Sequence, residues 1–166
     1  QSPAFVLHTG DEELQAPSVV IATGGLSIPK IGATAFGYDV ARQFDVKIRQ
    51  CRPALVPLTL GDEDRARWCD LAGVSAEVIA LAGRQRFREK MLITHRGLSG
   101  PAILQISSYW RPGDLVLLDL APERDVTSSL RVSPARRDAN AAKAALRAAL
   151  PARLAERWLE LHPPAN

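Results

Sequence analysis

A short apolar run that ends in two glycines constrains the possible folds of this chain most strongly. Residues 18–23 read SVVIAT, are rich in β-branched side chains and lead directly into Gly24-Gly25. A run that is apolar on both faces predicts a strand buried inside a sheet rather than a strand at its edge. Residues 4–8 are predicted to be its partner strand, and the polar residues 9–13 the hairpin loop between the two.

A helix is predicted over residues 36–44, where apolar side chains can share one helix face. Two strands and one helix cannot cover both faces of a sheet, so we expect the remaining strands of this sheet to lie outside the chain. Two more short strands are predicted at residues 46–49 and 54–60.

The middle of the chain is predicted to be mostly β-structure. Residues 74–81 and 84–94 alternate in part between polar and apolar side chains and flank Gly83, which predicts a hairpin. Residues 96–100 are bracketed by glycines and are predicted to be a loop. Pro101 suits the first position of a helix, because its missing N–H would have no partner there in any case.

The end of the chain is predicted to be helical, after a last apolar strand at residues 115–120. Residues 136–150 are rich in Ala, Arg, Lys and Leu, which favour helix, and Pro151 is predicted to open a second helix. Apolar side chains recur there at steps of three or four, which predicts one buried stripe. The stripe consists of Leu146, Leu150, Leu154, Trp158 and Leu161.

The order of these elements predicts an α/β plus β fold class with three domains. The predicted boundaries give residues 1–52, 53–122 and 123–166. The first of these is the least self-sufficient, because its sheet is incomplete.

Composition narrows the possible functions. The chain has 166 residues, of which 46% are hydrophobic and 23% charged, which is typical of a globular protein. The net charge of +3 is small, and the arginines are spread among 18 acidic residues, so no nucleic-acid partner is predicted. The two cysteines form no CxxC pair, and no metal site is predicted. Free thiols are typical of a reducing compartment, so we expect a cytoplasmic location. No apolar stretch is long enough for a membrane helix, so we expect no membrane partner.

The glycines after residues 18–23 are the first candidate binding site. Glycine lets the backbone approach a ligand closely, and ligands of open α/β sheets bind at the carboxyl ends of strands. A dinucleotide passing over Gly24 and Gly25 is one interpretation, and an ordinary turn is the other. The GxGxxG fingerprint is absent, since the segment Gly32–Gly37 has glycine only at its two ends.

Two further loops carry polar groups. Ser27, Pro29, Lys30 and Gly32 follow the glycines, and Lys30 could face a phosphate or a flavin, or be a solvated lysine in a turn. The stretch 94–101, THRGLSGP, places His95 just before a predicted helix start, where N–H groups attract anions. It lacks the GxSxG spacing of a nucleophile elbow, and a hydrolase triad is not favoured.

Three segments of the chain, in this order, match the pattern of one bacterial family. They are VVIATGGLSIPKIGATAFGYDVARQFDVKIRQCRPALVPLTL at 19–60, THRGLSGPAILQISSYW at 94–110 and LRAALPARLAERWLEL at 146–161. The chain resembles the BaiN/RdsA-like flavoproteins, the family that includes aminoacetone oxidase. The resemblance implies a central fragment: a remnant of an FAD-binding α/β domain, then a β-barrel-like insert, then the start of a small helical insert.

The resemblance also implies roles for individual residues. The chain departs from the family pattern in two places, with Ala35 in place of Gly and Asp45-Val46 in place of Gly-His. Lys30 and His95 are the predicted catalytic groups near the flavin, with Thr94 and Gly97 in the loop of His95. The residues predicted to bind FAD are Ala22, Thr23, Gly24, Gly25, Ser27, Pro29, Gly32 and Thr34.

The function implied for the parent protein is that of an FAD-dependent oxidoreductase. It would transfer a hydride or electron pair between a small-molecule substrate and FAD, with NAD(P) or oxygen as the second partner. The fragment alone is expected to be inactive. The alternative is a non-enzymatic lid or protein-interaction module. A homodimer formed by strand exchange is a further hypothesis, since a second copy could complete the sheet.

Overall fold

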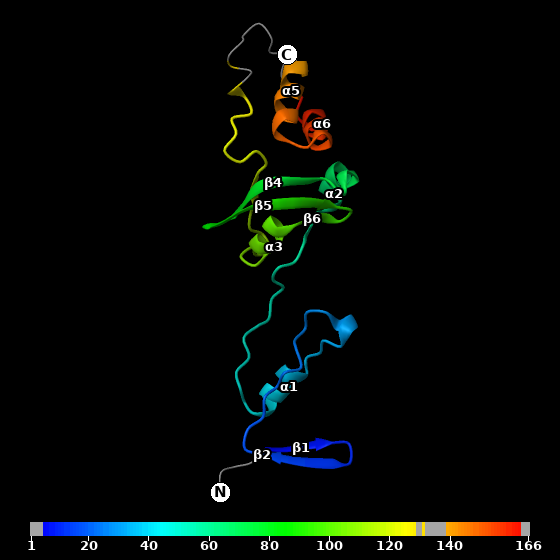
Figure 1. The fold of residues 1–166 in the computed structure, drawn as a ribbon, viewed down its shortest axis with the longest axis vertical. Coiled ribbons are helices and arrows are strands. Elements are labelled where there is room, and N and C mark those ends of the chain that lie inside the picture. The colour runs from blue at the N-terminus through cyan, green and yellow to red at the C-terminus, as the bar shows by residue number, and fades with distance from the viewer. Residues whose placement is uncertain (1–4, 129–130, 132–138, 164–166) are drawn as a thin grey trace. The chain divides into compact units, whose positions relative to one another are not determined.

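The computed structural model describes residues 5–128, 131 and 139–163 (Figure 1). The chain divides into two compact units, Gln1–Cys51 and Arg52–Asn166. Each unit is described by itself below. The division into three domains stays a prediction.

The first unit begins with a hairpin of β1 (Phe5–Thr9) and β2 (Glu12–Ala16). Phe5 pairs with Ala16 and Thr9 with Glu12, so Gly10 and Asp11 form a two-residue turn. Gly10 has a φ of +59°, which glycine adopts without strain. The predicted partner of residues 4–8 is therefore wrong, because residues 12–16 take that place in the ladder.

The predicted buried strand at residues 18–23 is also wrong for this structure. The segment has no strand assignment, and no described residue forms a ladder with it. Val20 is 87% exposed. A strand needs neighbouring strands to satisfy its N–H and C=O groups, and high β-propensity alone does not supply them.

One helix and one short 3-10 turn follow in this unit. The 3-10 turn is Pro29–Ile31, and α1 spans Phe36–Gln43, which confirms the helix predicted over residues 36–44. The Phe44 ring lies edge-on to Phe5 at 5.7 Å, so the end of α1 packs on the hairpin. Residues 46–49 are not a strand, again because no described strand pairs with them.

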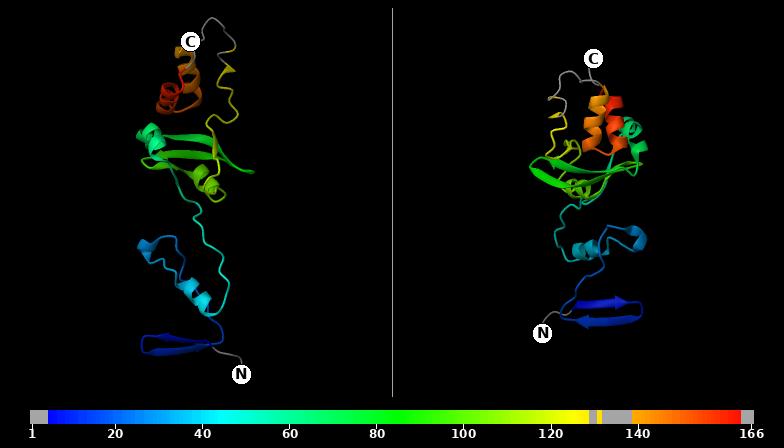
Figure 2. Two further views of the ribbon diagram at one scale, coloured as in Figure 1. Left: turned by 180° about the vertical axis from the view of Figure 1, so that it is seen from behind. Right: turned by 45° about the horizontal axis from the view of Figure 1, so that its top comes forward.

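The second unit contains a curled, antiparallel, five-stranded sheet (Figure 2). Its order is β3-β6-β5-β4-β7, so β3 and β7 are open edges and the sheet is a half-barrel. This agrees with the coarse prediction of a barrel-like insert. The strands are β3 (Leu58–Thr59), β4 (Ser75–Ala82), β5 (Gln85–Thr94), β6 (Gly97–Ser99) and β7 (Leu117–Asp119).

The turns of this sheet follow partly from the sequence. Ala82 pairs with Gln85, so Gly83 and Arg84 form the turn of the predicted β4–β5 hairpin. The loop predicted at 96–100 is wrong, because Gly97–Ser99 pairs as β6 with both β5 and β3. The strands predicted at 54–60 and 115–120 are present only as the shorter β3 and β7.

Helices lie on both sides of the sheet, with α5 and α6 on one side and α3 on the other (Figure 1). Pro101 is the first residue of α3 (Pro101–Ser107), as predicted. The two predicted C-terminal helices are α5 (Ala139–Ala149) and α6 (Ala152–Leu161). The helix α2 (Asp62–Trp68) and the 3-10 turn Cys69–Leu71 were not predicted.

The core of this unit lies where the helices meet the sheet. Val78 and Ala80 of β4 and Ile103 and Ile106 of α3 are fully buried. Leu154 of α6 is 2% exposed and belongs to the same cluster, so the predicted apolar stripe packs into the core. No helix among the described residues is long and apolar enough to cross a membrane.

An ion pair fastens α6 to the turn after α2. The Arg157 guanidinium donates to both Asp70 carboxylate oxygens, at 2.8 and 2.6 Å. This hydrogen bonding lowers the pKa of Asp70 and raises that of Arg157. Arg153 donates to the backbone carbonyl of Asp70 at 2.9 Å. Two arginines one turn apart on α6 therefore hold the same residue.

Candidate functional site

The predicted FAD-binding residues lie in one continuous segment of the first unit. Ala22, Thr23 and Gly24 are exposed, and Gly24 has a φ of +73° with open space where a Cβ would be. No backbone hydrogen bond between described residues occupies the N–H groups of residues 22–25. These groups are therefore free to bind a ligand or water.

The start of α1 supports this segment from one side. A Cβ on Gly37 would lie 3.4 Å from the Ile21 side chain and 3.7 Å from the Thr23 hydroxyl. A Cβ on Gly25 would lie 3.7 Å from the Tyr38 hydroxyl. Interaction with the Cys51 side chain raises the pKa of Tyr38. The bare backbone of residues 22–25 thus lies beside the start of α1.

The remaining predicted residues continue along the same loop. Ser27, Lys30 and Gly32 are exposed, and Gly32 has a φ of +88° with open space beside it. The backbone of Pro29 and Lys30 lies in the 3-10 turn. The Thr34 hydroxyl accepts a hydrogen bond from the Phe36 N–H at 3.4 Å, so it helps to begin α1. Lys30 has no carboxylate partner among the described residues.

The segment fits FAD as one wall of a site and not as an enclosure. Exposed N–H groups, glycines without side chains and a free lysine are suited to a nucleotide's phosphates or to a flat ring. Everything else that would surround a cofactor must come from outside residues 22–34. The assignment of these residues to FAD stays a prediction.

His95 lies at the tip of the β5–β6 hairpin in the second unit. Thr94 pairs with Gly97, so His95 and Arg96 form the two-residue turn and both are exposed. The Thr94 hydroxyl stabilises this turn by donating to the Gly97 carbonyl at 3.0 Å and accepting from the Arg96 N–H at 3.3 Å. The exposed imidazole of His95 has no hydrogen-bond or ion-pair partner among the residues that the structure describes, so it is accessible to a ligand. Lys30 and His95 belong to different units, and their relation stays a prediction.

Gly97 does not have the loop role predicted for it. It is buried in β6, and a Cβ there would lie 2.2 Å from the Leu58 carbonyl oxygen. Gly100 is similar, since its Cβ would lie 2.7 Å from the Lys90 carbonyl oxygen. The glycines of THRGLSGP are required by close packing of backbones, which the sequence does not distinguish from an anion-binding loop.

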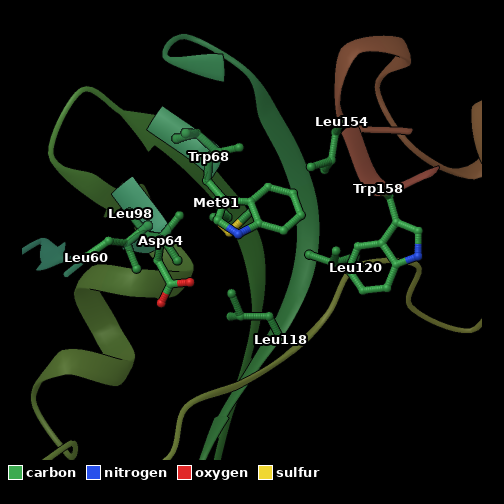
Figure 3. A pocket seen from close by; sticks show the side chains of 10 residues that line it. Leu60, Asp64, Trp68, Met91, Leu98, Leu118, Leu120, Leu154 and Trp158 are labelled. Atoms are coloured by element: carbon green, nitrogen blue, oxygen red, sulfur yellow. The ribbon is translucent and has the colours of Figure 1, made fainter. Parts of the chain in front are cut away.

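Sequence reasoning missed a cavity of about 270 Å³ in the second unit (Figure 3). It lies between the sheet, α2 and α6, and Asp64 is the charged residue of its lining. The signal that could have found it is the acidic start of α2, which was not recognised as a helix. With one carboxylate and no cation, the lining suits an apolar or aromatic group and not the phosphates of FAD. The lining residues are Leu60, Asp64, Trp68, Met91, Ile93, Leu98, Leu118, Leu120, Leu154 and Trp158.

Comparison with known proteins gives consistent matches. The family described as "HI0933-like protein barrel and H2TH domain" matches residues 52–165. The ribosomal RNA dihydrouridine synthase of Haemophilus influenzae is 40% identical over 158 residues, which are 94% of this chain and 39% of that protein. The protein of the same name from Escherichia coli is 42% identical over 158 residues, which are 95% of this chain and 40% of that protein. The chain thus spans about two fifths of the length of these relatives.

Proposed function

Because this chain belongs to the HI0933-like barrel and H2TH domain family, we propose that it is the central part of a flavin-dependent oxidoreductase acting on uridine in ribosomal RNA. The family predicted from the sequence is thereby confirmed. The observation that carries the proposal is the identity of 40–42% along nearly the whole chain to two ribosomal RNA dihydrouridine synthases.

The chemistry of that reaction fits a flavin. Conversion of uridine to dihydrouridine adds two hydrogens across a ring double bond, which requires a two-electron donor. When bound, a reduced flavin would supply one hydrogen as a hydride, the other would be added as a proton from a protein acid or water, and NAD(P)H is a suitable source for reduction of the flavin. This chain would contribute the bare backbone of residues 22–25 and the cation of Lys30 to binding, and would present His95 on its turn.

The relatives' names favour a different substrate from the one predicted on composition. No nucleic-acid partner was predicted from the low net charge and the scattered arginines, and a small-molecule substrate was implied by the family resemblance. Under the proposal, the substrate is a base within a large RNA, and binding needs only a local surface of positive charge. A cytoplasmic location agrees with such a substrate.

The incomplete sheet of the first unit also fits the proposal. The relatives contain far more chain than the described residues, and strands supplied by the rest of such a protein would pair with residues 18–23. Pairing would bury the side chains of this segment and leave Gly24 and Gly25 at the end of a strand, where α/β sheets bind ligands.

The test is a purification of the full-length protein followed by its visible absorption spectrum and by mass spectrometry of the nucleosides of ribosomal RNA. We expect flavin absorbance, and dihydrouridine in RNA incubated with protein and NAD(P)H. A colourless protein that forms no dihydrouridine would overturn the proposal and favour the non-enzymatic lid or interaction module.

A matched pair of variants tests the glycine surface. Gly24 and Gly10 both have a positive φ and open space beside them, so Gly24→Ala and Gly10→Ala carry a similar backbone strain. We expect Gly24→Ala to reduce the flavin content of the purified protein and Gly10→Ala to leave it unchanged. Equal flavin content in the two variants would show that residues 22–25 are not part of the cofactor site.

A further inference from the structure

We infer that the exposed end of the β4–β5 hairpin is a surface that binds the phosphate backbone of RNA. Its cations are Arg84, Arg86 and Lys90, which we call the basic arm. The inference rests on the proposed function and deepens it, because it names the surface that takes up the RNA.

The geometry of β5 places these cations in a row. Arg86, Arg88 and Lys90 occupy every second position of the strand. Their side chains therefore lie on the same face of the sheet, at intervals of about 7 Å. Arg84 follows on at the turn. All four are exposed. The row is thus a linear series of charges, suited to a linear series of phosphates.

Two acidic residues beside the row, Glu77 and Glu123, are bound by its central member, and Glu89 lies on the opposite face of β5. Arg88 contacts the Glu77 carboxylate at 2.7 Å and the Glu123 carboxylate at 2.8 Å. Neither Arg86 nor Lys90 has a carboxylate within 4.0 Å among the described residues, and the same holds for Arg84. Their charges are therefore available to a ligand.

Elsewhere in this unit, the described cations are either compensated or isolated. Those that bind a carboxylate are Arg65, Arg67, Lys143, Arg147, Arg157 and Arg131. The cations without an ion pair lie far apart in the sequence, each without another such cation nearby. They are Arg52, Arg96, Arg111, Arg124 and Arg153. Among the described residues of the second unit, uncompensated positive charge is therefore concentrated in the basic arm.

The arm is also accessible along its backbone. β6 pairs with β5 only at Leu92, Ile93 and Thr94, so residues 85–89 form an open strand edge (Figure 1). Charged side chains on such an edge also prevent aggregation with other strands. That role depends on the presence of charge and not on its sign, whereas RNA binding requires positive charge, so the two roles can be separated.

The experiment measures binding of the full-length protein to a fluorescent single-stranded oligouridine by anisotropy, from about 50 to about 200 mM salt. The test variant is Arg86→Gln with Lys90→Gln. The matched control is Arg65→Gln with Arg67→Gln on α2, which removes the same charge from residues that already bind Asp62 and Glu63. A third variant, Arg86→Glu with Lys90→Glu, keeps the edge charged but reverses its sign.

We expect the test variant to weaken RNA binding about tenfold and to lower the slope of log Kd against log salt by about 1.4, the effect of two lost phosphate contacts. The reversed variant is expected to stay monodisperse and to bind still more weakly. The control is expected to bind as the wild type does, and the flavin spectrum is expected to be the same in all four proteins.

Unchanged affinity and salt slope in the test variant would overturn the inference, as would a wild-type protein that does not bind RNA. If the variants instead lose a protein partner that pairs along the strand edge while RNA binding persists, the arm is a protein-binding edge and the inference is wrong. Failure of the proposed function is a separate result. If the protein binds RNA through the basic arm but forms no dihydrouridine, the inference about the basic arm stands and the proposed reaction is refuted.

Discussion

Replacement of Gly97 by alanine is expected to be among the most damaging single changes in the second unit. The residue lies in β6 opposite Thr59 of β3. An added Cβ would lie 2.2 Å from the Leu58 carbonyl oxygen, and 2.9 Å from the Leu60 nitrogen and the Thr59 Cα. All three are backbone atoms, so no side-chain rotation can relieve the overlap.

The magnitude follows from two costs. Gly97 has a φ of +150°, and a side chain in such a conformation costs about 1–3 kcal/mol. To remove the overlap, β3 must move away, which disrupts its pairing with β6 and the bond from the Leu60 N–H to the Arg96 carbonyl. Each lost hydrogen bond costs about 0.5–1.5 kcal/mol. We expect a total loss of about 3–5 kcal/mol, large against a typical domain stability of about 5–15 kcal/mol.

The assay is urea unfolding followed by tryptophan fluorescence, with Gly61→Ala as the control. Gly61 lies just after β3, has a φ of −63° and has open space beside it, so alanine there is expected to cost about 1 kcal/mol or less. If Gly97→Ala fails to fold while Gly61→Ala folds as the wild type does, that difference is itself the expected result. A free energy of unfolding for Gly97→Ala equal to that of Gly61→Ala would refute the close backbone packing of β3 on β6.

Two further predictions concern a hydrogen bond and an ion pair within the second unit. The buried Ser107 hydroxyl accepts a hydrogen bond from the Val56 N–H at 3.0 Å. Ser107→Ala is therefore expected to lower the free energy of unfolding in urea by about 1–3 kcal/mol. The control Ser108→Ala, at an exposed position, is expected to lower it by less than half as much. Arg157 lowers the pKa of Asp70, so the pair stabilises the fold fully above the unfolded pKa of about 3.8 and loses this contribution as the pH falls through the lower folded pKa. Asp70→Asn is expected to flatten that acid slope, and an unchanged slope would show that the ion pair does not form in solution.

The elements that the sequence predicts well are those fixed by local chemistry. Gly83 supplies a turn residue between two alternating runs, and the hairpin forms around it. Pro101 opens α3 because its fixed φ suits a first helical turn. The spacing of Leu150, Leu154 and Trp158 predicts a packed helix face without any knowledge of what it packs against.

The wrong predictions concern strands, because a strand depends on partners that may be distant in sequence. Residues 18–23 have the composition of a buried strand but have no ladder partner among the described residues. By contrast β6, with only Gly97–Ser99, is a strand because β3 and β5 lie on both sides of it. Local propensity was high in the first case and low in the second, and pairing decided both.

The missed helix α2 shows a signal that apolar periodicity does not detect. Its sequence, DEDRARW, has few apolar residues, but three acids occupy its first turn and two arginines its last. This order matches the helix dipole and allows pairs such as Arg65 with Asp62 and Arg67 with Glu63. Charge order would have predicted the helix, and with it the wall of the cavity beside Asp64.

The two glycine motifs of this chain show why a binding site is harder to predict than a turn. Gly24 directly follows Thr23, and Gly97 lies three residues after Thr94. Both glycines have a positive φ. At Gly24 the space for a side chain is open, so alanine there adds the strain of its positive φ but meets no neighbouring atom. At Gly97 that space is filled by the backbone of β3, so a substitution would damage the fold. Sequence shows only that a side chain is absent, and the structure shows whether the backbone of another segment fills the space or leaves it open. It follows that the proposed function requires Gly24→Ala to lose flavin while losing no more stability than Gly10→Ala, whereas the loss expected in Gly97→Ala is one of stability, because its side chain would overlap the backbone of β3.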